Sequence, residues 1–289
     1  MRPHPRKDKS EGLDVVVDLG ATHYRIGVPN SQLQEPAFVG KTPRTKEQIL
    51  DDLCDSITKV AGQYHSDLSS VTVGCPGLVN EAGMIFKSLY LPLTGCNLRA
   101  SLSERLHLAN TQVINDAKGQ ALSLLDQYVS TFYVVLGTGV GGAIIDRGRL
   151  VQGANSFAGE VGHIKVGNHS DECVCGRQGC LDAYASGMAL SKKLGDGWYG
   201  RPLTPNADDA LFSAGYHVAQ AVTIGMNLLD PEAVVIAGHI TAQPSFQSGF
   251  SNGWKKNELM KVQLTFLEQT WPLAFRGLTF LIRRAKHND

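Results

Sequence analysis

The feature that most constrains the fold of this chain is a pattern that occurs twice, once at the head of each half. In the first half, a β-branched apolar segment is followed by a short turn at residues 20–22 and a second apolar segment. The same order recurs in the second half around a glycine-rich turn at residues 137–142. The four predicted strands span residues 13–19, 24–28, 131–136 and 143–145. The repetition predicts a duplicated architecture with a cleft between the two copies.

The segments between these strands alternate between helical and extended patterns, which is typical of an α/β protein. Helices are predicted at residues 46–64, 98–106 and 214–229, and strands at residues 71–75, 112–114 and 233–237. We therefore expect two α/β domains that flank a cleft. The expected N-terminal domain, residues 1–116, holds the first turn and is joined by a C-terminal helix at residues 272–289. The expected C-terminal domain, residues 117–271, holds the second turn.

The composition argues against a polyanionic partner. The 289 residues are 43% hydrophobic and include 27 basic and 27 acidic side chains, so the net charge gives no reason to expect binding to nucleic acid or to a membrane surface. No apolar run approaches the roughly 18–20 residues that span a bilayer. Residues 1–9 form a basic tail without the apolar core of a secretory signal. We expect a cytoplasmic protein that binds a small molecule.

Three of the six cysteines lie close together in the sequence. Cys173, Cys175 and Cys180 fall within eight residues, separated by glycines that allow tight turns, and His163 precedes them. These residue types form the ligand set of a closed Cys3His zinc site, which is structural because it leaves no coordination position for water. Three reduced thiols without a metal are the alternative. The spacing and the lack of a signal segment favour zinc over disulfides and indicate a reducing compartment.

Two carboxylates, Glu160 and Asp182, flank this cysteine loop. Sugar recognition needs acceptors that satisfy several ring hydroxyls at once, and we expect these two side chains to bind such a ligand while the metal loop holds them in place. His163 can bind zinc through one ring nitrogen and a sugar hydroxyl through the other. The alternative is that both carboxylates are surface charges.

Both turns have the composition of a phosphate-binding loop. Backbone N–H groups in a turn after a buried strand can converge on one point, and glycines let a phosphate come close. Asp18 can organise Mg²⁺ through water, and Thr22 can donate a hydrogen bond to a phosphate oxygen. The candidate nucleotide-binding residues are Asp18, Gly20, Thr22, Gly137, Thr138, Gly139, Gly141 and Gly142. Either turn alone reads as an ordinary β-hairpin, and only their recurrence favours a nucleoside triphosphate site.

Asp116 is the candidate catalytic residue. It follows the predicted strand 112–114, next to Asn115 and ahead of a predicted helix. A carboxylate there can accept the proton of a hydroxyl that attacks phosphorus, while Asn115 holds another hydroxyl. The alternative is that Asp116 caps the helix, since Asp and Asn are favoured at that position, and the two roles can coexist.

In this order, the motifs resemble those of the ROK family (repressors, open reading frames, kinases), whose kinases phosphorylate hexoses and amino-hexoses with ATP. The resemblance extends from about residue 14 to residue 238. The matching segments are Asp18-x-Gly20-x-Thr22, Gly74-x-Pro76-Gly77, Asn115-Asp116, Gly137-Thr138-Gly139-x-Gly141-Gly142, Gly159-Glu160-x-Gly162-His163 and Cys173-x-Cys175-Gly176-x-x-Gly179-Cys180.

The resemblance implies an actin-like, ribonuclease-H-like ATPase fold, an ATP-dependent transfer to the 6-hydroxyl of a hexose with Mg²⁺, a structural zinc ion and a homodimer. It makes Asp116 the base and adds Gly238 to the nucleotide site. It also makes Asn115, Glu160, His163 and Asp182 sugar contacts, and His163, Cys173, Cys175 and Cys180 the zinc ligands.

Within the family, the chain is most similar to the D-allose kinase subgroup. The similarity lies in idioms such as Gly20-Ala21-Thr22-His23 and Leu91-Pro92-Leu93-Thr94. A glucose or N-acetylmannosamine kinase, or a sugar-binding regulator without kinase activity, is the alternative. A DNA-binding repressor is not expected, because only residues 1–13 precede the first turn, too few for a helix-turn-helix module.

The chain departs from the family pattern at four places. Tyr90 stands where the family usually has a sugar-contacting asparagine, and Asp182 stands where it usually has glutamate. Near the expected adenosine side, His239 interrupts a glycine-rich turn, and Leu278-Thr279 replaces an alanine pair. These changes put the sugar identity and the catalytic efficiency in question, since a larger side chain near the nucleotide can weaken its binding.

Overall fold

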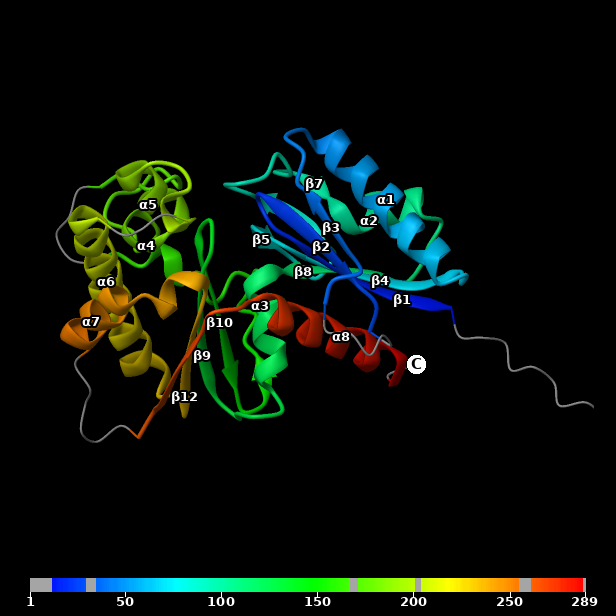
Figure 1. Cartoon of the computed structure of the whole chain (residues 1–289). Helices are drawn as coiled ribbons and strands as arrows, with labels where there is room; N and C mark the ends of the chain where they lie inside the picture. The colour runs from blue at the N-terminus through cyan, green and yellow to red at the C-terminus, as the bar shows by residue number, and fades with distance from the viewer. Residues whose placement is uncertain (1–11, 30–34, 167–170, 201–203, 255–260, 288–289) are drawn as a thin grey trace, which may run out of the picture.

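The computed structural model describes residues 12–29, 35–166, 171–200, 204–254 and 261–287, and the tail expected at residues 1–9 lies outside these ranges. Figure 1 shows two lobes, each built around a β-sheet, and a C-terminal helix, α8 (Trp271–His287), that returns from the second lobe to the first. None of the described helices is long and apolar enough to cross a membrane.

The first sheet is built around β1, all seven residues of which are buried. Its order is β3-β2-β1-β4-β8, with antiparallel pairing at β2 and β3 and parallel pairing at β4 and β8. The strands are β1 (Leu13–Leu19), β2 (His23–Gly27), β3 (Phe38–Lys41), β4 (Leu68–Cys75) and β8 (Thr111–Asn115). Val15 and Val17 pack in the same core as helix α1 (Lys46–Gln63), whereas Val16 packs against α8. Because helices cover both faces, the centre of β1 is an unbroken valine run.

The second sheet, β11-β10-β9-β12-β13, repeats the order and strand directions of the first. Its strands are β9 (Thr131–Leu136), β10 (Val140–Asp146), β11 (Arg149–Leu150), β12 (Ala233–Ala237) and β13 (Gln263–Leu267). The predicted duplication is confirmed. The returning strand β10 starts earlier than predicted, because Val140 to Gly142 continue the ladder with β9.

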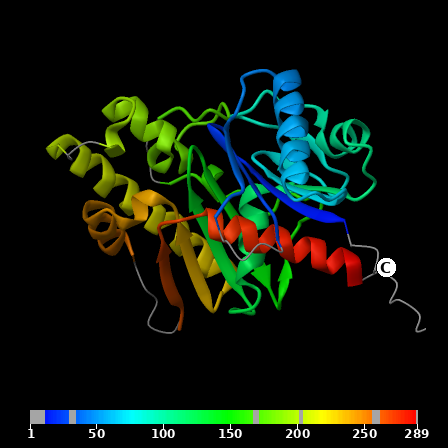
Figure 2. The same cartoon turned by 45° about the vertical axis from the view of Figure 1, so that its right-hand side comes forward.

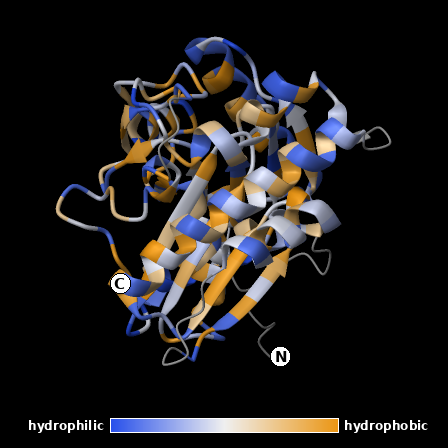
Figure 3. Ribbon diagram, turned by 90° about the vertical axis from the view of Figure 1, so that its left-hand side faces the viewer, coloured by the Kyte–Doolittle hydropathy of each residue, from blue (hydrophilic) through white to orange (hydrophobic). Residues whose placement is uncertain are grey.

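Helices α6 (Pro205–Leu229) and α7 (Pro244–Gly253) pack on each other and cover the second sheet (Figure 1). Helix α6 begins nine residues before the predicted start, because the Thr204 side chain caps it and Pro205 occupies its first turn. The helices in Figure 3 mix polar and apolar residues, whereas the strands are mostly apolar, as expected for helices that bury one face.

Helix α8 connects the two lobes and starts one residue before the predicted helix, whose last two residues lie outside the described ranges. Figure 2 shows it running on from the strand β13 at the edge of the second sheet. Gly277 lies against Gly119, where any side chain would collide with the carbonyl oxygen of Gly119. Leu278 packs with Val16, and Thr279 donates a hydrogen bond to the Phe275 carbonyl oxygen. The Gly277–Thr279 segment therefore packs within the fold, and none of its residues lines the cleft described below.

A small third sheet, β5-β6-β7, was not predicted, and the described part of the second lobe holds no counterpart of it. Its strands are β5 (Leu78–Val79), β6 (Met84–Lys87) and β7 (Cys96–Asn97), followed by helix α2 (Leu98–Arg105). Cys96 is the first residue of β7. The segment between β6 and β7 carries Tyr90 into the space between the lobes.

Candidate active site

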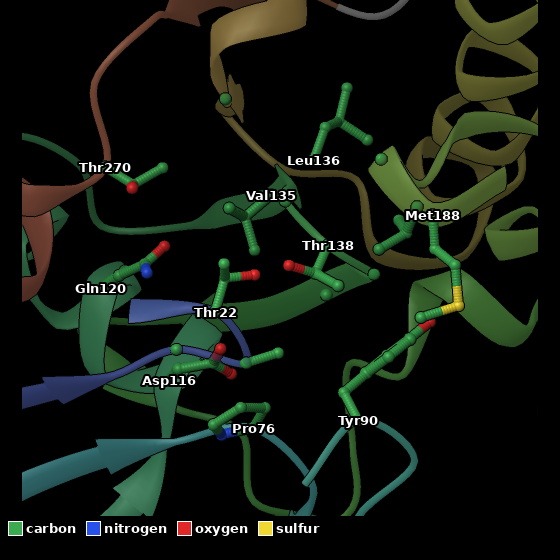
Figure 4. A pocket seen from close by; sticks show the side chains of 18 of the residues that line it. Thr22, Pro76, Tyr90, Asp116, Gln120, Val135, Leu136, Thr138, Met188 and Thr270 are labelled. Carbon is green, nitrogen blue, oxygen red and sulfur yellow. The ribbon is translucent and has the colours of Figure 1, made fainter. Parts of the chain in front are cut away.

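A cleft with a volume of about 1490 Å³ lies between the two lobes. It is lined from the first lobe by the turn after β1 and from the second by the turn between β9 and β10, and Figure 4 shows side chains of both turns at its walls. The structure brings together residues spread over the whole sequence. The expected site residues that line the cleft are Asp18, Gly20, Thr22, Asn115, Asp116, Gly137, Thr138, Gly139, Gly141, Gly142, Glu160, His163, Cys175, Asp182 and Gly238.

Asp116 is the first residue of the short helix α3 (Asp116–Ala121), which starts at the carboxyl end of β8. The helix cap is Asn115, whose Oδ1 accepts a hydrogen bond from the Lys118 N–H at 3.0 Å while its Nδ2 donates to the Gly77 carbonyl oxygen at 3.1 Å. The alternative that Asp116 is the cap is therefore wrong. Asp116 Oδ1 accepts a hydrogen bond from the Ala117 N–H at 2.9 Å. Figure 4 shows Asp116 beside Thr22 in the cleft.

Three carboxyl groups that line the cleft, those of Asp18, Asp116 and Glu160, have raised pKa values. Burial raises the pKa of Asp116 to about 6, although the Ala117 N–H works against the shift. Burial, and next the Asp116 carboxylate, raise the pKa of Asp18 to about 6 and that of Glu160 to about 7. Arg25 lies 3.6 Å from Asp18 and offsets part of its shift. Such a cluster favours binding of a cation or a proton.

Lys118 is a buried charged residue that sequence reasoning did not single out. Its side chain comes from α3 and is only 2% exposed. Its Nζ donates a hydrogen bond to the Ser156 carbonyl oxygen at 2.6 Å, and its charge offsets part of the pKa shift of Glu160. Lysine is seldom fully buried without a partner, so only the tertiary structure could have identified it.

Tyr90 and Asp182 meet across the cleft. The Tyr90 hydroxyl donates a hydrogen bond to Asp182 Oδ2 at 2.7 Å, and the Val140 N–H donates one to Asp182 Oδ1 at 2.8 Å. Asp182 is the first residue of helix α4 (Asp182–Ala185) and is only 4% exposed. Asp182 thus lines the cleft as expected, but both of its oxygens already have protein partners.

The cysteine loop and His163 form a compact cluster. One ligand atom from each of His163, Cys173, Cys175 and Cys180 lies within 4.8 Å of the others. The Cys173 Sγ to His163 Nδ1 distance and the Cys175 Sγ to Cys180 Sγ distance are both 3.7 Å. A tetrahedron with Zn–S bonds of about 2.3 Å has edges of about 3.8 Å, so these two distances suit a zinc site and the residue types are those of a Cys3His ligand set. With Nδ1 on the cluster side, Nε2 of His163 is left for a second partner.

The Cys175 thiol is the most acidic of the three. Burial alone raises its pKa, but hydrogen bonds from Arg177 and from the neighbouring thiols outweigh burial and lower the pKa to about 7. A thiolate is the form that binds metal.

Another part of the cleft wall, around Gly238 and His239, is formed by backbone turns and aromatic rings. Gly238 follows β12 with φ +128°, a conformation that side chains rarely adopt, and His239 begins the next helical turn. The rings of Tyr199 and His239 meet edge to face with centroids 5.4 Å apart. Helix α5 (Gly187–Leu194) starts at the second turn, where the Gly187 N–H donates to the Gly137 carbonyl oxygen at 2.8 Å. Sequence reasoning did not identify Tyr199, because its role depends on its tertiary neighbour.

Comparison with known proteins shows the family of this chain. The family model described as "ROK family" matches residues 15–256. An N-acetyl-D-glucosamine kinase of Escherichia coli is 30% identical over 283 residues, which cover 87% of this chain and 92% of the relative.

Solved structures show the same fold. A ROK family glucokinase from Streptomyces griseus, in complex with glucose and AMPPNP, superposes with a TM-score of 0.81 at 24% identity, over 94% of this chain and 100% of that one. A ROK hexokinase from Thermus thermophilus superposes with a TM-score of 0.71 at 23% identity, over 94% of this chain and 99% of that one. The chain thus has the expected two-domain, actin-like ATPase fold, and it belongs to the ROK family.

Proposed function

We propose that this chain is an ATP-dependent kinase that transfers the γ-phosphoryl group to the 6-hydroxyl of a hexose. The observation that carries the proposal is the half-buried carboxylate of Asp116, placed in one cleft with the two glycine turns. Family membership adds support, and the Escherichia coli relative is named a sugar kinase. Since the family fold hosts more than one activity, the site carries more weight than the fold.

Asp116 is the proposed base. As the 6-hydroxyl oxygen attacks the γ-phosphorus, the hydroxyl proton passes to Asp116, and the bond from the γ-phosphorus to the oxygen of the ADP leaving group breaks. A pKa of about 6 leaves the carboxylate mostly ionised at neutral pH and makes it a stronger base than an ordinary aspartate.

The two turns are the proposed nucleotide site. Thr22 and Thr138 offer hydroxyl donors from opposite lobes, and the glycines offer backbone N–H groups. Gly238 and the Tyr199–His239 pair suit the base and ribose. Mg²⁺ would neutralise phosphate charge here, and Asp18, which lines the cleft, is the residue proposed to hold it through water.

The cysteine cluster is the proposed structural zinc site, with His163, Cys173, Cys175 and Cys180 as ligands. Four protein ligands would fill all four coordination positions of the zinc ion, so the metal would stabilise the loop and take no part in the reaction. Through His163 it would orient the sugar end of the cleft.

Asn115, Glu160, His163 and Asp182 are the proposed sugar-binding residues, and D-allose is the first candidate substrate because of the subgroup idioms. Glucose and N-acetylmannosamine are the alternatives. A sugar-binding regulator without turnover is a further alternative, motivated by Tyr90 and His239. Calorimetry separates that regulator from a kinase, because the regulator would bind sugar without any affinity for ATP.

We also propose the domain boundaries at residues 116 and 271, a homodimer and a cytoplasmic location. Neither nucleic acid nor a membrane is a proposed partner. A gel-shift assay that detected sequence-specific DNA binding would overturn the first of these two exclusions.

The test of the proposed function is ADP release with a panel of hexoses for the wild type and for Asp116→Asn. Asp209→Asn, an exposed substitution outside the cleft, is the matched control. We expect turnover with at least one hexose for the wild type and the control, and a severe loss for Asp116→Asn. Equal rates for the wild type and Asp116→Asn would contradict the assigned role.

A further inference from the structure

Tyr90 belongs to the first lobe, and its side chain is hydrogen-bonded to a residue of the second lobe. It lies between β6 and β7, and its hydroxyl reaches Asp182 at 2.7 Å. Its ring covers Gly139 so closely that a methyl group on Gly139 would lie 2.5 Å from the ring. Figure 4 shows the Tyr90 ring pointing into the pocket beside Met188. The ring therefore occupies space in the cleft itself.

The hydrogen bond keeps the Tyr90 ring over the Asp182 carboxylate, which is buried. Asp182 is only 4% exposed, and its two oxygens accept hydrogen bonds from Tyr90 and from the Val140 N–H. Burial, and next the Asp182 charge, raise the pKa of the Tyr90 phenol above its ordinary value, so the hydroxyl keeps its proton and remains the donor. A ligand at this end of the cleft meets the phenol ring first.

The ring stands at the end of the cleft away from the proposed base. The Asp116 charge raises the pKa values of both Asp18 and Glu160, whereas the charges that shift the pKa of Tyr90 are those of Asp182 and the cysteine loop. In a pyranose, the 6-hydroxyl arm is attached to C5, and the ring atom opposite C5 is C2. A hexose with its 6-hydroxyl at Asp116 therefore points C2 toward the end that Tyr90 closes.

We infer that Tyr90 is a specificity-determining residue that excludes a bulky substituent at C2, so that the site takes plain hexoses in preference to N-acetylhexosamines. In this inference Asp182 acts on the sugar through Tyr90 rather than by direct contact, as a positioning residue that holds the Tyr90 phenol in place. The inference rests on the proposed kinase function and goes beyond it. It also sets this chain apart from the relative named an N-acetyl-D-glucosamine kinase.

The test uses two sugars that differ only at C2, D-glucose and N-acetyl-D-glucosamine. For each we would measure kcat/KM by ADP release with the wild type, Tyr90→Asn and Tyr90→Phe. We expect the wild type to prefer glucose by more than about tenfold, since steric exclusion of even one methylene group reaches that size. Tyr90→Asn removes the ring and should reduce the preference at least about tenfold, mainly through a lower KM for the acetylated sugar. Tyr90→Phe keeps the ring and should keep most of the preference.

The role of Asp182 is tested by a double-mutant cycle on the same ratio. Asp182→Ala, which removes the acceptor, should lower the preference in the wild-type background to the small extent that Tyr90→Phe does, and no further in the Tyr90→Phe background, where the hydrogen bond is already absent. A purely structural role would change both backgrounds alike. The cycle remains available if Tyr90→Asn fails to fold.

Equal efficiency of the wild type with both sugars, or an unchanged preference in Tyr90→Asn, would overturn the inference while leaving the kinase proposal intact. If no protein turned over any hexose, the kinase proposal would fail instead. Dissociation constants for the two sugars, measured by calorimetry, would then decide the inference by the same ratio.

Discussion

Each lobe contains a five-stranded sheet of the same topology, but the two lobes differ in the segments that are added to that sheet. Both sheets have the same strand order and directions, and each presents a turn to the cleft after its central strand. The end of the cleft where Tyr90 meets Asp182 is instead built from two segments without a repeat among the described residues. They are the β5-β6-β7 insertion with Tyr90 and the cysteine loop that leads to Asp182. Under the proposed function, the duplicated frame would provide the phosphate chemistry, and the added segments would determine which sugar is accepted.

Among the substitutions in the duplicated frame, Asp116→Asn should lower the catalytic rate most. It keeps the size of the side chain and removes the proposed base, so kcat should fall about 10²- to 10⁴-fold. The KM for the sugar should change little, because the proposed sugar contacts Asn115, Glu160 and His163 are left in place. Steady-state kinetics of ADP release measure both constants, and an unchanged kcat would remove Asp116 from the mechanism.

Cys175→Ser tests the added segments in the same way. Loss of the proposed zinc ion should weaken sugar affinity by about 10- to 100-fold, because the metal orients His163 and the cysteine loop. Affinity for ATP should be retained, since both turns belong to the duplicated frame. Calorimetry with each ligand and a metal assay give the readouts, and chelation of the wild type should reproduce the result.

Cys54→Ser is the matched control, because Cys54 lies in α1 outside the cluster. It should keep about one zinc ion per chain, the count expected for one closed site. A metal-free preparation of the wild type with full sugar affinity would refute the zinc proposal.

The central strands could be predicted from the sequence because their environment is uniform. Leu13–Leu19 and Thr131–Leu136 are buried along their whole length, so their bounds could be predicted correctly from apolar runs. The edge strand Phe38–Lys41 is only half covered and alternates between intermediate and exposed residues, so it gave no such run. Edge strands and short added sheets depend on neighbours that a sequence window does not contain.

The site residues were predictable where a local motif places them. The two turns follow strands that are buried throughout, Asp116 follows the edge strand β8, and each lies at a strand end. The contact between Tyr90 and Asp182 joins residues 92 positions apart, and the burial of Lys118 depends on the loop at Ser156. No local pattern encodes these pairs, so the sequence identified candidate ligands but not which of them face the substrate.

The pH dependence of the rate provides a finer test of the frame. The pKa of Asp116 is raised to about 6, so the base takes up a proton as the pH falls below that value. We expect kcat/KM to fall about tenfold per pH unit below pH 6, and to level off above it. The residual activity of Asp116→Asn should lack this acid limb. A limb that survives in the variant would assign the titration to Asp18 or Glu160.

The smallest expected effect compares the two turns directly. A methyl group on Gly20 would lie 2.7 Å from the His23 carbonyl oxygen, whereas one on Gly137 would meet nothing closer than 3.9 Å. Gly20→Ala should therefore lower the free energy of unfolding by about 1–2 kcal/mol, while Gly137→Ala should leave it nearly unchanged. Thermal unfolding of the two variants measures the difference. Equal losses would mean that both turns are packed to the same density, and that the duplication extends from the strand order to the side-chain contacts.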